Sequence, residues 1–185
     1  MIVTNDGKYN EVRFNKGDFA HLVGVRSHLN DLDFYKNFIK GTIAENNINN
    51  QQRYDFGTIR KKIMRITKIN KIVYANAQTN LVLVNLHTKT RDFPLAIEST
   101  NDKMVVAFTG KDLHARSLRN NNQTNADEKK NILAIFSKEK NSKSKYSNCV
   151  YLKNYKVLKS ICCDLEEKVS VKIFNDLDKN KTTQI

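Results

Sequence analysis

The sequence has few of the features that mark secreted or membrane proteins. Its three cysteines, Cys149, Cys162 and Cys163, form neither an even disulfide framework nor a metal-ligand spacing. We therefore expect reduced thiols, as in a cytoplasmic protein. No run approaches the ~20 apolar residues that a membrane-spanning helix needs, and the first residues, MIVTNDGKYN, lack the charged-then-apolar pattern of a signal peptide. These absences predict a cytoplasmic protein with no membrane partner.

Acidic residues are scarce compared with basic ones. The 185 residues include 32 Lys and Arg but only 19 Asp and Glu, which gives a formal net charge of +13. Such a surface attracts phosphate backbones over distances set by ionic screening. The alternative is that a lysine- and asparagine-rich composition reflects an AT-rich genome. A chain of this length, with 39% hydrophobic residues, can form one domain whose core needs no disulfide or metal.

The apolar periodicity predicts two helices in the first third of the chain, after a short strand at residues 8–14. The first helix would begin after a cap at Asn30 or Asp31. Its buried stripe would consist of Leu32, Tyr35, Ile39 and Ile43, with Phe38 widening it. The second helix would bury Phe56, Ile59, Ile63 and Ile66 and expose Lys61, Arg65 and Lys68, with Arg60 and Lys62 at the sides.

The rest of the chain predicts strands and then a last helix. Short runs rich in β-branched residues favour strands at 71–75, 81–86, 103–108, 131–136 and 149–152. The stretches 87–102, which holds the only proline, Pro94, and 109–130 are interpreted as long connections. Residues 160–178 predict a helix with Ile161, Leu165, Val169, Ile173 and Leu177 at steps of four.

This order predicts an α+β fold, in which N-terminal helices pack on a four- to five-stranded antiparallel sheet and an additional C-terminal helix closes the domain. We expect a main domain over residues 1–155. Residues 156–185, the C-terminal helix and tail, would pack on that same domain.

Phosphoryl-transfer chemistry without a metal is the chemistry that the sequence leaves open. Phosphate-binding Gly-rich loops, GxSxG, HExxH and paired CxxC motifs are all missing. The acid pairs Asp31/Asp33 and Glu166/Glu167 are typical of helix ends and solvated surfaces. Histidine, arginine, lysine and serine suffice for RNA, because the 2′-hydroxyl of the substrate is itself the nucleophile. A histidine can then accept or donate a proton, and cations can stabilise the phosphorane, so we expect no cofactor.

Two of the four histidines lie in segments suited to such a site. His21 stands between apolar anchors and Gly24 in the segment FAHLVG, and His114 lies among donors in LHARSLR. The alternatives are a structural histidine at the first position and a solvated loop at the second. His28, before a helix cap, and His87, at a strand end, are expected to be non-catalytic.

Short motifs in these segments resemble the phage nucleases of the barnase–EndoU–colicin–RelE-like (BECR) fold. The motif that follows the first strand in that family corresponds to His21-Leu22-Val23-Gly24-Val25. A later Arg-x-Ser type stretch, an "iLaiF" strand and a tyrosine-containing hairpin are similar to Arg116-Ser117-Leu118, residues 132–136 and Tyr146. The resemblance spans residues 8 to about 152, and the predicted C-terminal helix departs from the simplest version of the fold.

Together, the residues and the resemblance predict a metal-independent endoribonuclease, toxin-like or a phage or mobile-element effector, in the cytoplasm of a bacterial host cell. His21 would be the general base, or form a base–acid pair with His114. Phosphorane stabilisation and phosphate positioning would involve Arg116, Lys111, Ser117 and Thr109. Nucleic-acid binding would involve Lys61, Lys62, Arg65, Lys68 and Arg119. Two alternatives remain: a non-catalytic basic nucleic-acid-binding protein, and a phage-encoded inhibitor of a host nucleic-acid-processing protein. The expected partners are RNA or another nucleic acid, and a host protein or cognate inhibitor.

Overall fold

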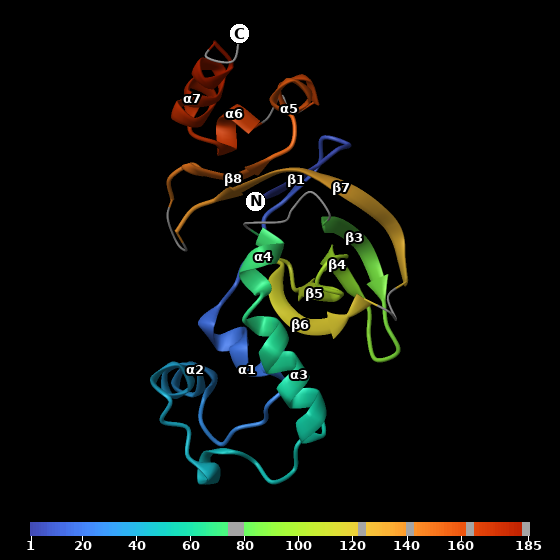
Figure 1. Cartoon of the computed structure of the whole chain (residues 1–185), viewed down its shortest axis with the longest axis vertical. Helices are drawn as coiled ribbons and strands as arrows, with labels where there is room; N and C mark the ends of the chain where they lie inside the picture. Colours follow the sequence, from blue (N-terminus) through green and yellow to red (C-terminus); the bar gives the residue numbers. More distant parts are fainter. Residues whose placement is uncertain (74–79, 122–124, 140–142, 162–164, 183–185) are drawn as a thin grey trace.

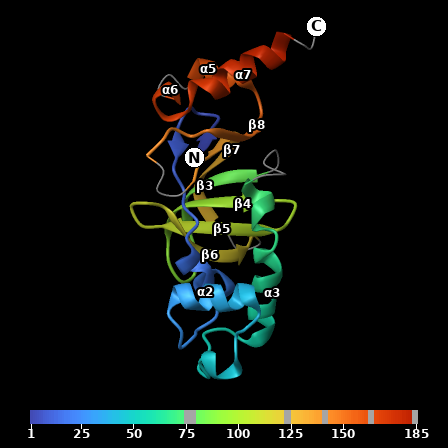
Figure 2. The ribbon, with the colours of Figure 1, turned by 90° about the vertical axis from the view of Figure 1, so that its left-hand side faces the viewer.

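The molecule is elongated, with helices at both ends and a curled antiparallel sheet between them (Figures 1 and 2). The computed structural model describes residues 1–73, 80–121, 125–139, 143–161 and 165–182. The N-terminal helices lie at one end of the long axis and the C-terminal helices at the other. The predicted α+β class, with helices on an antiparallel sheet and a helical C-terminal region, is confirmed.

The sheet has eight strands rather than the four or five predicted. Its order is β2-β1-β7-β3-β4-β5-β6, with β8 paired to β7, and all pairs are antiparallel. The strands are β1 (Ile2–Thr4), β2 (Tyr9–Asn10), β3 (Asn80–His87), β4 (Phe93–Ser99), β5 (Met104–Thr109), β6 (His114–Asn120), β7 (Asn125–Ser137) and β8 (Asn148–Leu152). Of the predicted strand 8–14, only Tyr9 and Asn10 form a strand of the sheet, β2.

The outer edge of β6 faces the N-terminal half of the chain. The backbone of Arg13 pairs with the start of β6. The Arg13 amide donates to the Leu113 carbonyl at 3.0 Å, and the Ala115 amide donates to the Arg13 carbonyl at 2.9 Å. Helices α1 (Phe19–Val23) and α3 (Phe56–Ile66) contact the same strand. The segment after β2 and these helices therefore cover an edge that would otherwise be open.

The two predicted long connections contain strands. Residues 87–102 include β4, and residues 109–130 include β6 and the start of β7. Pro94 lies inside β4, not in a connection. The pairing of β3 with β4 skips Asn85 opposite Pro94, and Asn85 has a positive φ of 50°. Because the ladder is interrupted there, the missing N–H of proline costs no hydrogen bond.

The predicted strand at 71–75 is wrong as far as the structure describes it. Residues Ile69–Val73 form helix α4, and Ile72 is buried in the main core beside Val82, Met104 and Ile132. A short apolar run has no periodicity that separates a buried strand from a buried helix. Residues 76–79 (NAQT), whose small number and polar character predict a hairpin connection, lie outside the described residues.

Both predicted N-terminal helices exist, and each buries part of its predicted stripe together with residues outside it. Helix α2 (Asp31–Lys40) begins at the predicted cap, where the Asn30 side chain accepts from the Asp33 amide. However, Leu32 and Ile39 are 53% and 65% exposed. The buried face instead carries Phe34 and Phe38, whose rings pack with Phe19. The predicted Tyr35 and Phe38 thus keep their place, with Tyr35 also contacting the Phe19 ring at 5.5 Å between centroids, and Phe34 replaces the aliphatic members Leu32 and Ile39.

Helix α3 keeps most of its predicted stripe. Ile59 is buried and Ile63 and Ile66 are partly buried, as predicted, whereas Phe56 in the first turn is 79% exposed. Lys62 is only 6% exposed. The predicted position of Lys62 at the side of the stripe is therefore wrong, because its long side chain enters the molecule between α1 and β6.

The predicted C-terminal helix is three helices: α5 (Tyr155–Ile161), α6 (Leu165–Lys168) and α7 (Val171–Thr182). Leu165, Val169 and Ile173 keep the predicted step of four and are buried against Val3 and Phe136, among others. The helix is interrupted because the backbone of Tyr146 pairs there. Its amide donates to the Lys168 carbonyl at 2.8 Å, and its carbonyl accepts from the Ser170 amide at 2.9 Å. In the part of the chain that the structure describes, no helix is long and apolar enough to cross a bilayer.

Candidate active site

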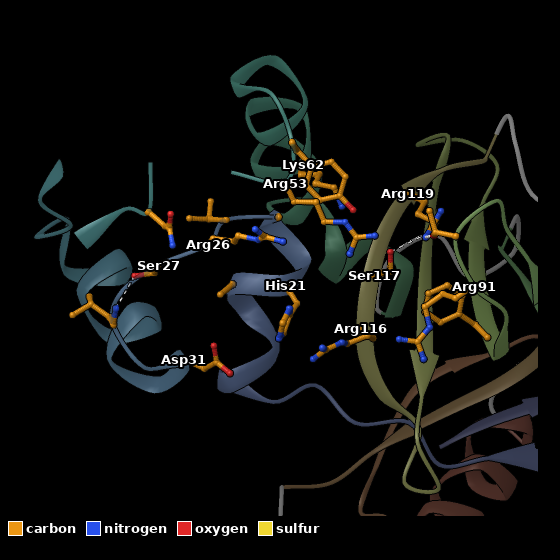
Figure 3. Close-up of a pocket in the computed structure, with 18 residues that line it drawn as sticks. His21, Arg26, Ser27, Asp31, Arg53, Lys62, Arg91, Arg116, Ser117 and Arg119 are labelled. Carbon is orange, nitrogen blue, oxygen red and sulfur yellow. Dashed lines mark hydrogen bonds between the residues drawn. The ribbon is translucent and has the colours of Figure 1, made fainter. Parts of the chain in front are cut away.

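A pocket of about 500 Å³ lies between the N-terminal helices and the edge of the sheet (Figure 3). It is strongly cationic, because its wall holds six lysine or arginine side chains and one carboxylate, Asp31. The cations are Arg26, Arg53, Lys62, Arg91, Arg116 and Arg119. None of them has an ion-pair partner among the described residues. The pocket therefore concentrates positive charge that the protein itself does not neutralise.

His21 stands in this pocket because helix α1 is short and one-sided. Ala20, Leu22 and Val23 face the core, so the residue between them turns its imidazole toward the guanidinium of Arg116 (Figure 3). Partial burial and the charge of Arg116 lower the pKa of His21, while Asp31 and Asp18 oppose that shift. At neutral pH this imidazole is therefore mainly unprotonated and can accept a proton.

Arg116 owes its direction to an irregularity in the sheet. The register of β5 with β6 shifts between Ala107, which pairs with Ser117, and Phe108, which pairs with Ala115. No residue of β5 lies opposite Arg116, which is the extra residue of a bulge. A bulge redirects a side chain relative to regular alternation, and here it directs a cation toward His21.

Lys62 forms the buried part of the wall. Its Nζ donates to the Leu118 carbonyl at 2.9 Å and lies 4.9 Å from the centre of the Tyr54 ring. Burial, followed by the charges of Arg119, Arg65 and Arg53, lowers the pKa of Lys62 to about 8. Gly24 makes room for it, since a Cβ there would lie 2.9 Å from Lys62 Cδ. With its φ of +77°, Gly24 also ends α1 in a left-handed conformation.

Arg91 and Arg119 share one aromatic ring on the sheet side of the pocket. Their guanidinium carbons lie 4.9 and 5.5 Å from the centre of the Phe93 ring. Arg119 donates to Ser117 Oγ at 3.1 Å and to Thr90 Oγ1 at 2.7 Å. Arg91 donates to Thr109 Oγ1 at 3.1 Å. Both guanidinium groups are thus positioned by neutral groups.

The structure brings together about half of the site residues predicted from the sequence. Those that line the pocket are His21, Lys62, Arg116, Ser117 and Arg119. Those that do not are Thr109, Lys111, His114, Lys61, Arg65 and Lys68. Among the latter, Lys68 pairs with Asp102 at 3.5 Å, and Thr109 reaches the site only through its hydrogen bond to Arg91.

His114 lies beside the pocket rather than in it. Its Nδ1 lies 3.1 Å from Asp112 Oδ1, and its Nε2 lies 3.9 Å from Oδ1 of the buried Asp18. Asp18 directly precedes α1 and His114 begins β6. The contact between them therefore joins α1, which carries His21, to β6, which carries Arg116.

The other two histidines lie outside the pocket. His87 ends β3, as predicted, between Asp92 at 3.2 Å and Asp127 at 3.0 Å. His28 is exposed. Among the described residues, no three His, Cys, Asp or Glu side chains are placed to hold a metal ion together.

Several pocket residues were missed by the sequence analysis, chiefly Arg26, Arg53, Tyr54, Arg91 and Phe93. Arg91 and Phe93 lie in the stretch interpreted as a connection. A signal was present, because residues 93–97 (FPLAI) are all apolar, but Pro94 concealed the strand. Arg26 and Arg53 lie in polar loops whose approach to α1 no local pattern indicates.

The comparison with family models identifies the chain. Residues 1–155 match the model of the family described as phage-Barnase-EndoU-ColicinE5/D-RelE like nuclease4. The searches of curated proteins and of solved structures each returned no significant match. The match covers most of the chain, including α1, β6 and every residue that lines the pocket. The chain therefore belongs to the phage-Barnase-EndoU-ColicinE5/D-RelE like nuclease4 family.

Proposed function

We propose that this protein is a metal-independent endoribonuclease that cleaves RNA by attack of the 2′-hydroxyl on the adjacent phosphate. The observation that carries the proposal is the pairing of His21 with Arg116 in a pocket with six cations and one carboxylate. The family accounts for nuclease activity in general. The proton acceptor beside a phosphate-binding cation favours RNA in particular, because RNA supplies its own nucleophile.

In the proposed reaction His21 removes the proton of the 2′-hydroxyl. The 2′-oxygen then bonds to phosphorus, the bond from phosphorus to the 5′-oxygen breaks, and a 2′,3′-cyclic phosphate forms. Arg116 stabilises the additional negative charge of the phosphorane, an electrostatic effect worth a few kcal/mol for one well-placed donor. Ser117, next to Arg116 at the bulge, positions a phosphate oxygen.

The leaving 5′-oxygen must receive a proton. In this scheme it comes from Lys62, the lysine of the pocket wall, whose pKa burial lowers to about 8. A lysine with its ordinary pKa would be a poorer donor at neutral pH. His114, which does not line the pocket, acts in this scheme by holding α1 against β6.

The biological role that fits this chemistry is a toxin-like phage or mobile-element effector in the cytoplasm of a bacterial host. Residues 1–155 would carry the nuclease, and the helices of residues 156–185 would stabilise the same domain. A cognate inhibitor of such an enzyme would present carboxylates to the pocket, because six uncompensated cations attract an acidic surface.

The proposal is tested by incubating the purified protein with a DNA strand that contains a single ribonucleotide, in EDTA. We expect one cut, on the 3′ side of that ribonucleotide, with a 2′,3′-cyclic phosphate on the product. The all-deoxy strand should bind and stay intact. Cleavage of the all-deoxy strand, or activity that appears only with added Mg²⁺, would contradict the mechanism. Salt-dependent binding of RNA without any cleavage would identify a non-catalytic binder.

A further inference from the structure

Arg91 and Arg119 form an unusual pair on the sheet side of the pocket (Figure 3). Both lie against the Phe93 ring, which is only 1% exposed beneath them. Their hydrogen bonds go to the hydroxyls of Ser117, Thr90 and Thr109. Among the described residues, neither guanidinium meets a carboxylate within ion-pair distance. The pair is therefore rigidly placed, but its charge is not neutralised.

This arrangement is costly unless an anion completes it. Burial lowers the pKa of Arg119, the nearby Tyr54 opposes this effect, and the charges of Arg53 and Arg91 lower it further. The partly buried Arg119 and the exposed Arg91 repel each other, and an anion bound between them would replace that repulsion with attraction. Two planar guanidinium groups are well suited to a phosphate, which each can bind through two parallel hydrogen bonds.

The pair is separate from the reaction centre, although its Arg119 and the Arg116 of the reaction centre both lie on β6. The side chain of Arg116 leaves the bulge toward His21, whereas that of Arg119 lies on the side of Arg91 (Figure 3) and over the Phe93 ring. The strand therefore presents two cationic positions in succession. A nucleic-acid strand that passes along β6 would meet one phosphate at each.

We propose that Arg91 and Arg119, held on Phe93, form a second phosphate subsite that binds the phosphate next to the scissile one. The inference rests on the proposed function and makes it more specific. The substrate is a strand with at least two successive phosphates, so a dinucleotide with a single phosphate is a poor substrate. The subsite thus favours cutting inside a strand over cutting isolated dinucleotides.

The first experiment measures binding alone, with all-deoxy strands that carry one, two and three phosphates. For the wild-type protein, we expect the second phosphate to raise the affinity about tenfold. It should also steepen the slope of the logarithm of the binding constant against the logarithm of the salt concentration by about 0.7. In the Arg91→Gln/Arg119→Gln variant this gain should vanish. The Arg60→Gln/Lys172→Gln variant loses the same charge at exposed positions outside the pocket, and it should keep the gain. An unchanged gain in the first variant would overturn the subsite.

The second experiment locates the subsite with a DNA strand that holds one ribonucleotide and, one linkage from it, an uncharged methylphosphonate. For the wild-type enzyme, the neutral linkage on one side of the cut should lower kcat/KM about tenfold. The glutamine variant should be insensitive to that replacement. If it remains as sensitive as the wild type, the subsite is wrong while cleavage itself stands. If nothing is cleaved but the binding gain depends on the two arginines, the nuclease proposal fails and the subsite stands.

Thermal unfolding of each variant separates a binding effect from a folding defect. Should the glutamine variant be unfolded, Arg91→Lys/Arg119→Lys replaces it, because lysine keeps the charge but loses the flat, forked donor. This variant should retain the salt dependence and still lose most of the affinity gain. A folded lysine variant with the full gain would contradict a guanidinium-built site.

Discussion

The cations of the pocket differ from a set of surface lysines in whether a carboxylate lies within ion-pair distance. On the surface, Lys130 lies 2.7 Å from Asp6 and 2.9 Å from Glu128, and Lys168 lies 3.1 Å from Glu11. In the pocket, no described carboxylate pairs with any of the six cations. In the pocket, cations from distant segments therefore converge without a paired carboxylate among the described residues, as the proposed role in anion binding requires.

The two groups also differ in what they do for stability. Exposed ion pairs such as Lys168 with Glu11 contribute little, about 0–1 kcal/mol each. The pocket contains cations that burial and mutual repulsion make unfavourable, of which Lys62 is the clearest case. Functional sites often contain groups that lower the stability of the folded protein.

The largest expected contrast is in catalysis. Arg116→Ala should lower kcat/KM for RNA about 10²- to 10³-fold, because the phosphorane loses its charge-stabilising donor. Lys36→Ala removes an equal charge that is paired with Asp33 on α2, and it should change kcat/KM less than twofold. Steady-state cleavage of the strand with a single ribonucleotide measures both. Similar losses in the two variants would mean that net charge, rather than position, governs the rate.

The pH dependence of kcat/KM should show two limbs. Since His21 must be neutral to accept a proton, the rate should rise with pH through a value below 6.5, the ordinary pKa of histidine, which is lowered here. Lys62 must be protonated, so the rate should fall as pH increases through about 8. Lys62→Arg should remove the upper limb, because arginine stays charged. An upper limb that persists in this variant would exclude Lys62 as its source.

The smallest expected effect is on stability. The pKa of Lys62 falls from 10.5 to about 8 on folding, so the unfolded chain holds this proton more tightly. The charged lysine therefore destabilises the fold below pH 8, and the penalty disappears as pH rises toward 10.5. Lys62→Met should raise the free energy of unfolding by about 1–2 kcal/mol at pH 7, after loss of the hydrogen bond to Leu118. Urea unfolding at pH 7 and pH 9.5 should show a gain that shrinks at the higher pH, and a destabilised variant would contradict this account.

The sequence was most informative where local chemistry alone decides the structure. His21 stands out because apolar neighbours and Gly24 fix how α1 must lie, and Arg116 with Ser117 stands out as a dense set of donors. The cap at Asn30 and the hairpin of β7 with β8 are also local features. All of these could be predicted without knowledge of the tertiary contacts.

The rest depended on contacts between distant segments. Helix α4 replaced a predicted strand because Ile72 is buried among strands that come later in the chain. β4 was missed because the tolerance for Pro94 depends on Asn85 in the neighbouring strand. Lys62 was assigned to the side of a helix, since nothing local indicates that Gly24 and Tyr54 make room for it. Three of the six pocket cations, Arg26, Arg53 and Arg91, could therefore not be predicted.

The central claim is that His21 removes a proton in a site whose cations bind the strand. The most direct test compares His21→Ala with His28→Ala, a change at an exposed histidine outside the pocket. We expect the first to lower kcat for the strand with a single ribonucleotide at least ~10²-fold. Its affinity for the all-deoxy strand and its unfolding should match those of the wild type, while the second variant should behave as wild type throughout. A His21→Ala enzyme that cleaves within a few fold of the wild-type rate would contradict the claim.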